Sequence, residues 1–136
     1  MNRFKNKKIL LIICGGIAAY KSLELIRILK KNGTQVKTIL TKSATEFVTK
    51  LSVSSLSEEK VYTDLFDHEL ESEMSHIKLS RWADLILICP ATANTISKLS
   101  KGTADDLAST VVIASNKHCL LYTSPSPRDR TRSRMP

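Results

Sequence analysis

Two short aliphatic runs, each leading through a turn of small residues into a helix-like segment, most constrain how this chain can fold. They are Ile9–Ile13 and Leu85–Cys89. Short, wholly apolar runs are typical of strands that are buried on both faces of a parallel sheet. At 136 residues the chain is long enough for one domain. The sequence therefore predicts a doubly wound parallel α/β sheet, a flavodoxin-like or Rossmann-like three-layer sandwich with Ile9–Ile13 at its centre.

The turn after Leu85–Cys89 is a candidate ligand site. Pro90 ends the strand, the small residues 91–95 follow, and a helix is predicted over Ile96–Lys101. Hydroxyl and amide groups in such a turn can bond a ligand, and the small side chains let it approach the backbone. Open α/β sheets place ligands at this position because free N–H groups and the helix dipole meet there.

The turn after Ile9–Ile13 contains two adjacent glycines, Gly15 and Gly16. Adjacent glycines permit positive φ and a close approach of the backbone to a phosphate. The pattern is neither the G-x-G-x-x-G fingerprint nor a P-loop, so phosphate binding and a purely structural turn both fit it. A helix follows, with apolar positions at spacings of three and four, and Gly33 ends it.

A second buried strand is predicted over Val36–Leu40, and it is followed by Thr41, Lys42 and Ser43. Hydroxyls at the carboxyl end of a strand can hold a phosphate, and Lys42 adds positive charge. A helix N-cap by Thr41 or Ser43 is the simpler interpretation of the same residues. Both interpretations place these side chains beside the glycine turn.

The middle of the chain has weaker signals. A short helix and an exposed strand around Lys60–Tyr62 are predicted, and the acidic stretch Asp67–Glu73 is typical of a solvated face. His76 lies in an alternating segment, where a histidine is usually a surface or core residue. Trp82 and Asp84 are expected to pack against and cap the turn into Leu85–Cys89.

The last predicted elements follow Gly102, which is expected to end the helix begun near residue 96. Asp105 or Asp106 is expected to cap a helix over Leu107–Ser115. Residues 116–118 then form a turn toward a further strand. No apolar run is long enough for a membrane span, and the three cysteines are in no metal spacing. We therefore expect a cytoplasmic protein with no metal and no disulfide.

The net charge of +8 is unevenly distributed. Residues 119–136 hold four of the seven arginines, three of the four prolines and no lysine, and 119–129 resembles a translated sequencing adapter. We expect residues 119–136 to be an artefactual tail, or a disordered one. The remaining 17 basic and 12 acidic residues give +5, so the charge argues only weakly for a nucleic-acid-binding protein.

Three motifs resemble those of the homo-oligomeric flavin-containing cysteine decarboxylases. They are PATANT with the downstream GTADDL, the string GGIAAYK, and M-x-H-I-x-L-x-x-W-A-D. Within that family they are most similar to the decarboxylase part of the bacterial bifunctional coenzyme A biosynthesis enzymes. The resemblance covers about residues 5–118, which we take as an incomplete flavoprotein domain.

The resemblance implies FMN as cofactor and decarboxylation of 4′-phosphopantothenoyl-cysteine to 4′-phosphopantetheine. It makes His76, rather than His68 or His118, the catalytic acid/base, and it gives Asn94 the positioning of flavin or substrate. It also implies a homo-oligomer based on trimers, in which His76 can serve a flavin held partly by a neighbour. The implied cofactor-binding residues are Gly15, Gly16, Ile17, Thr41, Ser43, Pro90, Ala91, Thr92, Ala93 and Asn94.

Two family motifs are missing from the printed sequence, a P-A-M-N motif with a substrate-binding Asn and a flap with a cysteine. We therefore expect this chain alone to be poorly stable and inactive, and a ligase domain is expected to follow in the parent gene. Other functions in the same fold are a peptide-cysteine decarboxylase, a flavin prenyltransferase and a non-catalytic FMN-binding regulatory subunit.

Overall fold

The chain forms a five-stranded, wholly parallel sheet in a computed structural model that describes residues 5–63, 76–104 and 106–122. The strand order is β3-β2-β1-β4-β5. This is the Rossmann order, so the structure selects one of the two predicted types. The strands are β1 (Lys8–Ile13), β2 (Gln35–Leu40), β3 (Val61–Thr63), β4 (Leu85–Ile88) and β5 (His118–Leu121).

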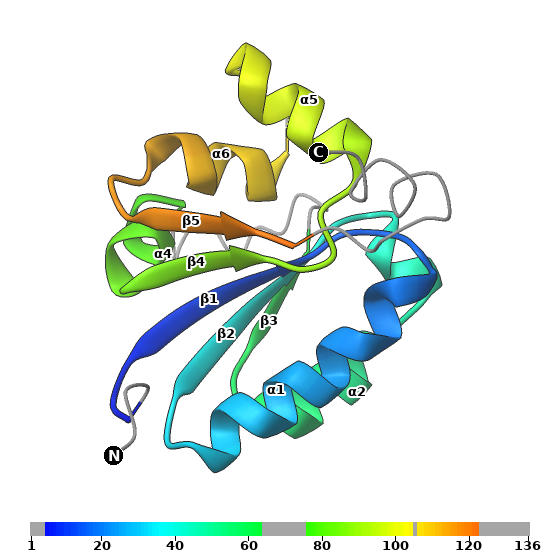
Figure 1. Cartoon of the computed structure of the whole chain (residues 1–136), viewed down its shortest axis with the longest axis vertical. Helices are drawn as coiled ribbons and strands as arrows, with labels where there is room; N and C mark the ends of the chain where they lie inside the picture. Colours follow the sequence, from blue (N-terminus) through cyan, green and yellow to red (C-terminus); the bar gives the residue numbers. More distant parts are fainter. Residues whose placement is uncertain (1–4, 64–75, 105, 123–136) are drawn as a thin grey trace, which may run out of the picture.

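Helices cover both faces of the sheet, as predicted for a three-layer sandwich. Figure 1 shows α1 and α2 on one side and α4 and α6 on the other. The helices are η1 (Ile17–Tyr20), α1 (Lys21–Lys31), η2 (Ala44–Glu46), α2 (Lys50–Ser57), α4 (His76–Trp82), α5 (Ala93–Lys101) and α6 (Leu107–Ala114). In the described ranges, no helix combines the length and the hydropathy that a membrane crossing requires.

Strand β1 is the centre of the molecule because it supplies both cores. Its residues 9, 11 and 13 pack with Ile26 of α1 and Val53 of α2. Residues 10 and 12 pack on the opposite face with Leu79 of α4 and Val111 of α6. Side chains alternate between the two faces of a strand, so a continuous aliphatic run is what a strand covered on both sides needs. The prediction of a central first strand is confirmed.

The sheet directs three strand ends to one edge. β1 pairs in parallel with β2 on one side and with β4 on the other. The chain thus moves outward through β2 and β3 and returns to the opposite side of β1. Such a reversal of strand order opens a crevice at the carboxyl ends of the strands on either side of it. The segments after Ile13, Leu40 and Ile88 all begin at this edge.

Several local predictions are corrected. β3 is not exposed, since Val61 and Tyr62 are 2% and 6% accessible. The alternating segment that contains His76 is a helix over His76–Trp82, because Leu79 and Trp82, three positions apart, both pack into the core on one face of the sheet, whereas Ile77 is exposed. α5 begins at Ala93, three residues before the predicted start at Ile96. Asn94 and residue 95 therefore lie in the first turn of α5.

Other expectations at element ends are confirmed. Gly102 ends α5 with φ of 70°, and Asp106 caps α6. Asp84 Oδ2 accepts the Lys8 backbone N–H (2.9 Å), which fixes the turn into β4. The ammonium of Lys37 lies 4.8 Å from the centre of the Trp82 ring. Trp82 and Asp84 thus pack and cap as predicted.

The sheet continues past the boundary predicted at residue 118. Cys119, Leu120 and Leu121 pair with β4 as part of β5, in register with Ile86, Leu87 and Ile88. The rest of the predicted tail, 123–136, lies outside the described residues. So do the acidic stretch 67–73 and His68.

Candidate functional site

A cleft of about 480 Å³ opens at the carboxyl edge of the sheet. Its walls come from the segments that follow β1, β2 and β4, which is where the strand order predicts a ligand. One wall consists of the loops after β1 and β2, and the other consists of α5 and the start of α6. The lining residues are Cys14, Gly15, Thr41, Lys42, Ser43, Thr92, Asn94, Thr95, Lys98 and Asp106.

The two predicted glycines have different physical reasons to be glycine. A Cβ on Gly15 would lie 2.4 Å from the Ser43 Cβ and 3.0 Å from the Ser43 carbonyl carbon. Gly15 therefore lets the β1 loop pack directly on the β2 loop. Gly16 has φ of 143°, which other residues rarely adopt, and a Cβ there would meet nothing within 4 Å. Packing explains Gly15, whereas Gly16 is required by its backbone conformation.

The hydroxyls of Thr41 and Ser43 also differ. Thr41 is 8% accessible, and its Oγ1 accepts the Ala44 backbone N–H at 3.2 Å. That bond fulfils the simpler interpretation, a local cap. Ser43 is exposed, and its side chain makes no cap bond at the start of η2. The Ser43 hydroxyl thus lines the cleft without the local bond that holds Thr41.

Two long-range hydrogen bonds hold the segment between β4 and α5. Ser22 Oγ, on α1, donates to the Cys89 carbonyl at 2.7 Å. The Ala91 backbone N–H donates to the Tyr122 carbonyl at 2.7 Å. Because each bond joins distant parts of the chain, this segment is positioned by tertiary structure as well as by Pro90.

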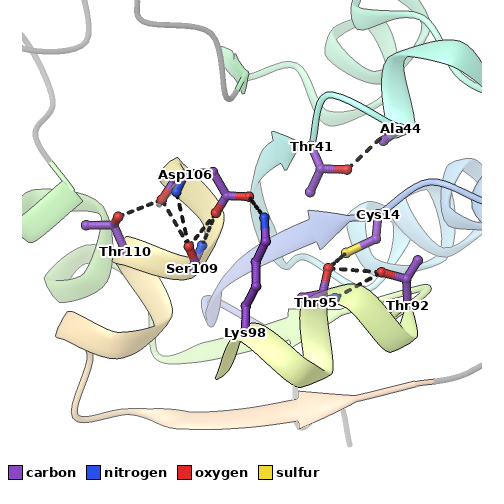
Figure 2. Close-up of polar contacts among 9 residues, drawn as sticks. All are labelled: Cys14, Thr41, Ala44, Thr92, Thr95, Lys98, Asp106, Ser109 and Thr110. Atoms are coloured by element: carbon purple, nitrogen blue, oxygen red, sulfur yellow. Dashed lines mark hydrogen bonds and ion pairs between the residues drawn. The ribbon is translucent and has the colours of Figure 1, made fainter. Parts of the chain in front are cut away.

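The first turn of α5 is tied to β1. Thr92 is the N-cap, and its Oγ1 accepts the Thr95 backbone N–H at 3.2 Å. The Thr92 and Thr95 hydroxyls bond each other at 3.1 Å, and the Cys14 Sγ lies 3.3 Å from Thr95 Oγ1 (Figure 2). Asn94 is exposed in this turn and lines the cleft.

An ion pair links α5 to α6 at the wall of the cleft. Lys98 Nζ lies 3.2 Å from Asp106 Oδ2, and Figure 2 shows the lysine side chain extending from α5 toward the carboxylate. The other carboxylate oxygen accepts the Ser109 backbone N–H at 2.8 Å and the Ser109 hydroxyl. Burial raises the pKa of Asp106, but the Ser109 bonds and Lys98 together lower it below its usual value.

The structure brings together five of the predicted site residues: Gly15, Thr41, Ser43, Thr92 and Asn94. Gly16 adjoins them without lining the cleft. Ile17 points into solvent, with 79% of its surface accessible, and Ala93 is also exposed. Pro90 and Ala91 are buried behind the cleft. The site roles themselves stay predictions.

The structure places His76 at the first position of α4. Its side chain lies outside the described part of the chain. No described residue of α4 lines the cleft. The catalytic role of His76 therefore stays a prediction.

Five lining residues were not among the predicted site residues: Cys14, Lys42, Thr95, Lys98 and Asp106. Lys98 had one available signal, because residues four apart lie on the same helix face and Asn94 precedes it by four. Asp106 was identified as a cap, but only the folding of α6 against α5 brings it to the cleft. In the described ranges, no three His, Cys, Asp or Glu side chains are grouped to hold a metal.

The cleft has the donors that a phosphate-bearing ligand requires. Hydroxyls, the backbone at Gly15 and the lysines Lys42 and Lys98 provide hydrogen bonds and positive charge. The exposed Asn94 side chain offers an amide on the opposite wall. A ligand with a phosphate and a polar ring thus has partners on both walls.

Comparison with known proteins agrees with this geometry. A family model described as Flavoprotein matches residues 2–126. The coenzyme A biosynthesis bifunctional protein CoaBC of Borreliella burgdorferi is 50% identical over 111 residues, which are 82% of this chain and 28% of that protein. The chain therefore spans less than a third of the length of that relative.

Two solved structures have the same fold. A PPC decarboxylase variant is 29% identical, with a TM-score of 0.78 over 94% of this chain and 76% of that one. The FMN binding protein AtHal3 is 32% identical, with a TM-score of 0.69 over 81% of this chain and 60% of that one.

Proposed function

Because this chain belongs to the Flavoprotein family, we propose that it binds FMN in the cleft and forms the flavin-binding core of a phosphopantothenoylcysteine decarboxylase of coenzyme A biosynthesis. One observation carries the proposal. A cleft at the reversal of strand order unites Gly15, Ser43 and Asn94, which come from the segments that follow three different strands. The names of CoaBC and of the FMN-binding and decarboxylase structures support this ligand and this reaction.

The loops after β1 and β2 would hold the FMN phosphate. Gly15 packs these loops together, and the space beside Gly16 is open, because a Cβ there would meet nothing within 4 Å. We assign the direct phosphate contact to Ser43, because Thr41 already bonds the Ala44 N–H. Lys42 adds positive charge on the same wall. The flavin ring would then extend toward the first turn of α5 and Asn94.

The reaction would convert 4′-phosphopantothenoyl-cysteine into 4′-phosphopantetheine and CO₂. Loss of CO₂ from a cysteine carboxylate leaves a carbanion that needs an electron sink. FMN supplies the reversible two-electron oxidation of the thiol-bearing carbon, so no net redox change remains at the end. Asn94 would orient the flavin or the substrate, and His76 would move the proton.

We place the action of His76 at the cleft of a neighbouring copy of the chain. No described residue of α4 lines the cleft that the same chain forms. Four large apolar side chains are exposed on the segments that follow the two phosphate loops: Ile17, Tyr20, Phe47 and Leu51. Burial of such residues between copies would stabilise the trimer-based homo-oligomer that the family resemblance implies. A cytoplasmic location is part of this proposal.

FMN binding by the purified chain is the test that carries the proposal. The chain is mixed with FMN, dialysed, and read for retained flavin absorption and quenched flavin fluorescence. We expect stoichiometric FMN, and its absence would refute the proposal. Turnover is then assayed by mass spectrometry in the chain extended with the P-A-M-N segment of a curated relative. There His76→Asn is expected to lower the rate about 100-fold or more while FMN stays bound.

A non-catalytic FMN-binding subunit is the second candidate function. It is supported by the similarity to the FMN binding protein AtHal3, whose name states a cofactor and no reaction. The same assay separates the two functions. Retained FMN without product from the extended chain would select the binding function over the decarboxylase.

A further inference from the structure

Lys98 has a different place in the cleft from the residues already given a role. It comes from α5, on the wall opposite the two phosphate loops. Lys98 lies one helical turn after Asn94, so the two side chains project from the same face of the helix. The lysine side chain is 25% accessible, and Asp106 holds its ammonium at 3.2 Å. A positive charge is thereby fixed on the wall that we assign to the flavin ring.

The oxidised flavin ring is neutral, whereas the two-electron-reduced ring carries a negative charge at neutral pH. A fixed positive charge beside the ring therefore favours the reduced form. The effect is stronger in a partly buried site than in water, because the effective dielectric constant is lower. Lys98 lies in such a site, since both members of its ion pair are about three-quarters buried.

We propose that Lys98 is a flavin-contacting residue that binds the negative charge of the reduced FMN ring, and that Asp106 positions its ammonium and moderates its charge. This inference rests on the proposed binding of FMN. It gives the ion pair a role beyond joining α5 to α6. The carboxylate limits the effect of Lys98, because it neutralises part of the ammonium charge.

The reduction potential of bound FMN tests the inference without any assay of turnover. The whole chain is loaded with FMN, and its midpoint potential is measured by reductive titration against a reference dye. Affinities for oxidised and reduced FMN are measured in parallel. Lys98→Met is expected to weaken binding of reduced FMN about tenfold and leave oxidised FMN nearly unchanged. That ratio equals a fall of about 30 mV for a two-electron couple.

Two further variants distinguish charge from shape. Lys98→Arg keeps the positive charge and should hold the midpoint potential close to that of the parent chain. Asp106→Asn keeps an N-cap residue for α6 but removes the negative charge, so it should raise the potential. Opposite shifts from the two members of one ion pair are not expected if the pair only holds the helices together. Lys98→Gln replaces Lys98→Met if the latter fails to fold.

Each remaining outcome overturns the inference. Equal weakening of oxidised and reduced FMN, with an unchanged potential, would assign Lys98 to the phosphate. Unchanged affinities and potential in all variants would leave the ion pair with a structural role only. A parent chain that retains no FMN would refute the proposed function itself, and that result is distinct from a bound flavin whose potential ignores Lys98.

Discussion

At Gly15 the loop after β1 packs closely against Ser43 in the loop after β2. A methyl group there would lie 2.4 Å from the Ser43 Cβ, so Gly15→Ala must separate the loops. Overpacking of this kind destabilises by about 1–3 kcal/mol. We expect that loss in denaturant unfolding, together with weaker FMN binding. Adding Ser43→Gly to Gly15→Ala removes the closest atom and should recover part of the stability; no recovery would contradict the packing explanation.

Substitutions of the two hydroxyl residues in the loop after β2 should affect different properties, one the affinity for FMN and the other the stability of the fold. Ser43→Ala removes a proposed phosphate donor that has no cap bond, so FMN affinity should fall about tenfold or more and stability should change by less than about 0.5 kcal/mol. Thr41→Val deprives the Ala44 N–H of its acceptor and should lower stability by about 1 kcal/mol. Titration calorimetry and denaturant unfolding measure the two effects. A reversed pattern would assign the phosphate to Thr41.

At the scale of elements, the capping carboxylate of α6 makes stability depend on pH. Its interactions lower the pKa of Asp106 in the folded state. The carboxylate therefore stabilises the fold above the unfolded pKa of about 3.9, and the contribution is lost as pH falls through and below that value. Asp106→Asn should be less stable than the parent at about pH 7, and the difference should shrink toward about pH 3. A constant difference across this range would exclude the carboxylate charge as its cause.

The segment between β4 and α5 depends on a bond from α1. Ser22 is fully buried and its Oγ donates to the Cys89 carbonyl. Ser22→Ala leaves that carbonyl without this donor and should destabilise by about 1–3 kcal/mol. Ser100→Ala is the matched control, because the Ser100 hydroxyl makes an exposed bond to the Ser97 carbonyl. Chemical denaturation measures the free energy of unfolding of both variants. Equal losses of stability would argue against a special role for the buried bond.

At the scale of the whole molecule, self-association is expected to depend on the exposed apolar residues that follow the loops after β1 and β2. Ile17 is 79% accessible in the single chain. A charge at this position, as in Ile17→Glu, should disfavour an apolar contact between copies and yield smaller assemblies by light scattering. Ile28→Glu is the control, since Ile28 is a half-exposed residue of α1 at 49% accessibility. If both variants reduced the size of the assemblies equally, Ile17 would have no specific part in the contact between copies.

The aliphatic pattern of the sequence was enough to predict the architecture. Aliphatic runs at 9–13 and 85–89 are typical of strands covered on both faces, and β1 and β4 indeed lie side by side in the sheet. The C-terminal end of α5 and the start of α6 were also predictable, because Gly102 and Asp106 act through local backbone conformation and a cap bond. These features depend on contacts within a few residues or on a simple pattern of burial.

Other features of the fold and of the cleft depend on contacts between distant segments, which no local sequence pattern contains. The strand order is the Rossmann order. Strand β3 is buried although it lies at an edge of the sheet, and the folded helices α5 and α6 bring Lys98 and Asp106 to the cleft. Tertiary packing also explains why residue 15 is a glycine, since the Ser43 side chain that leaves no room for a Cβ belongs to the loop after β2. The physical cause is the same in each case. These properties arise from contacts between segments far apart in the chain, and such contacts exist only after the sheet has assembled.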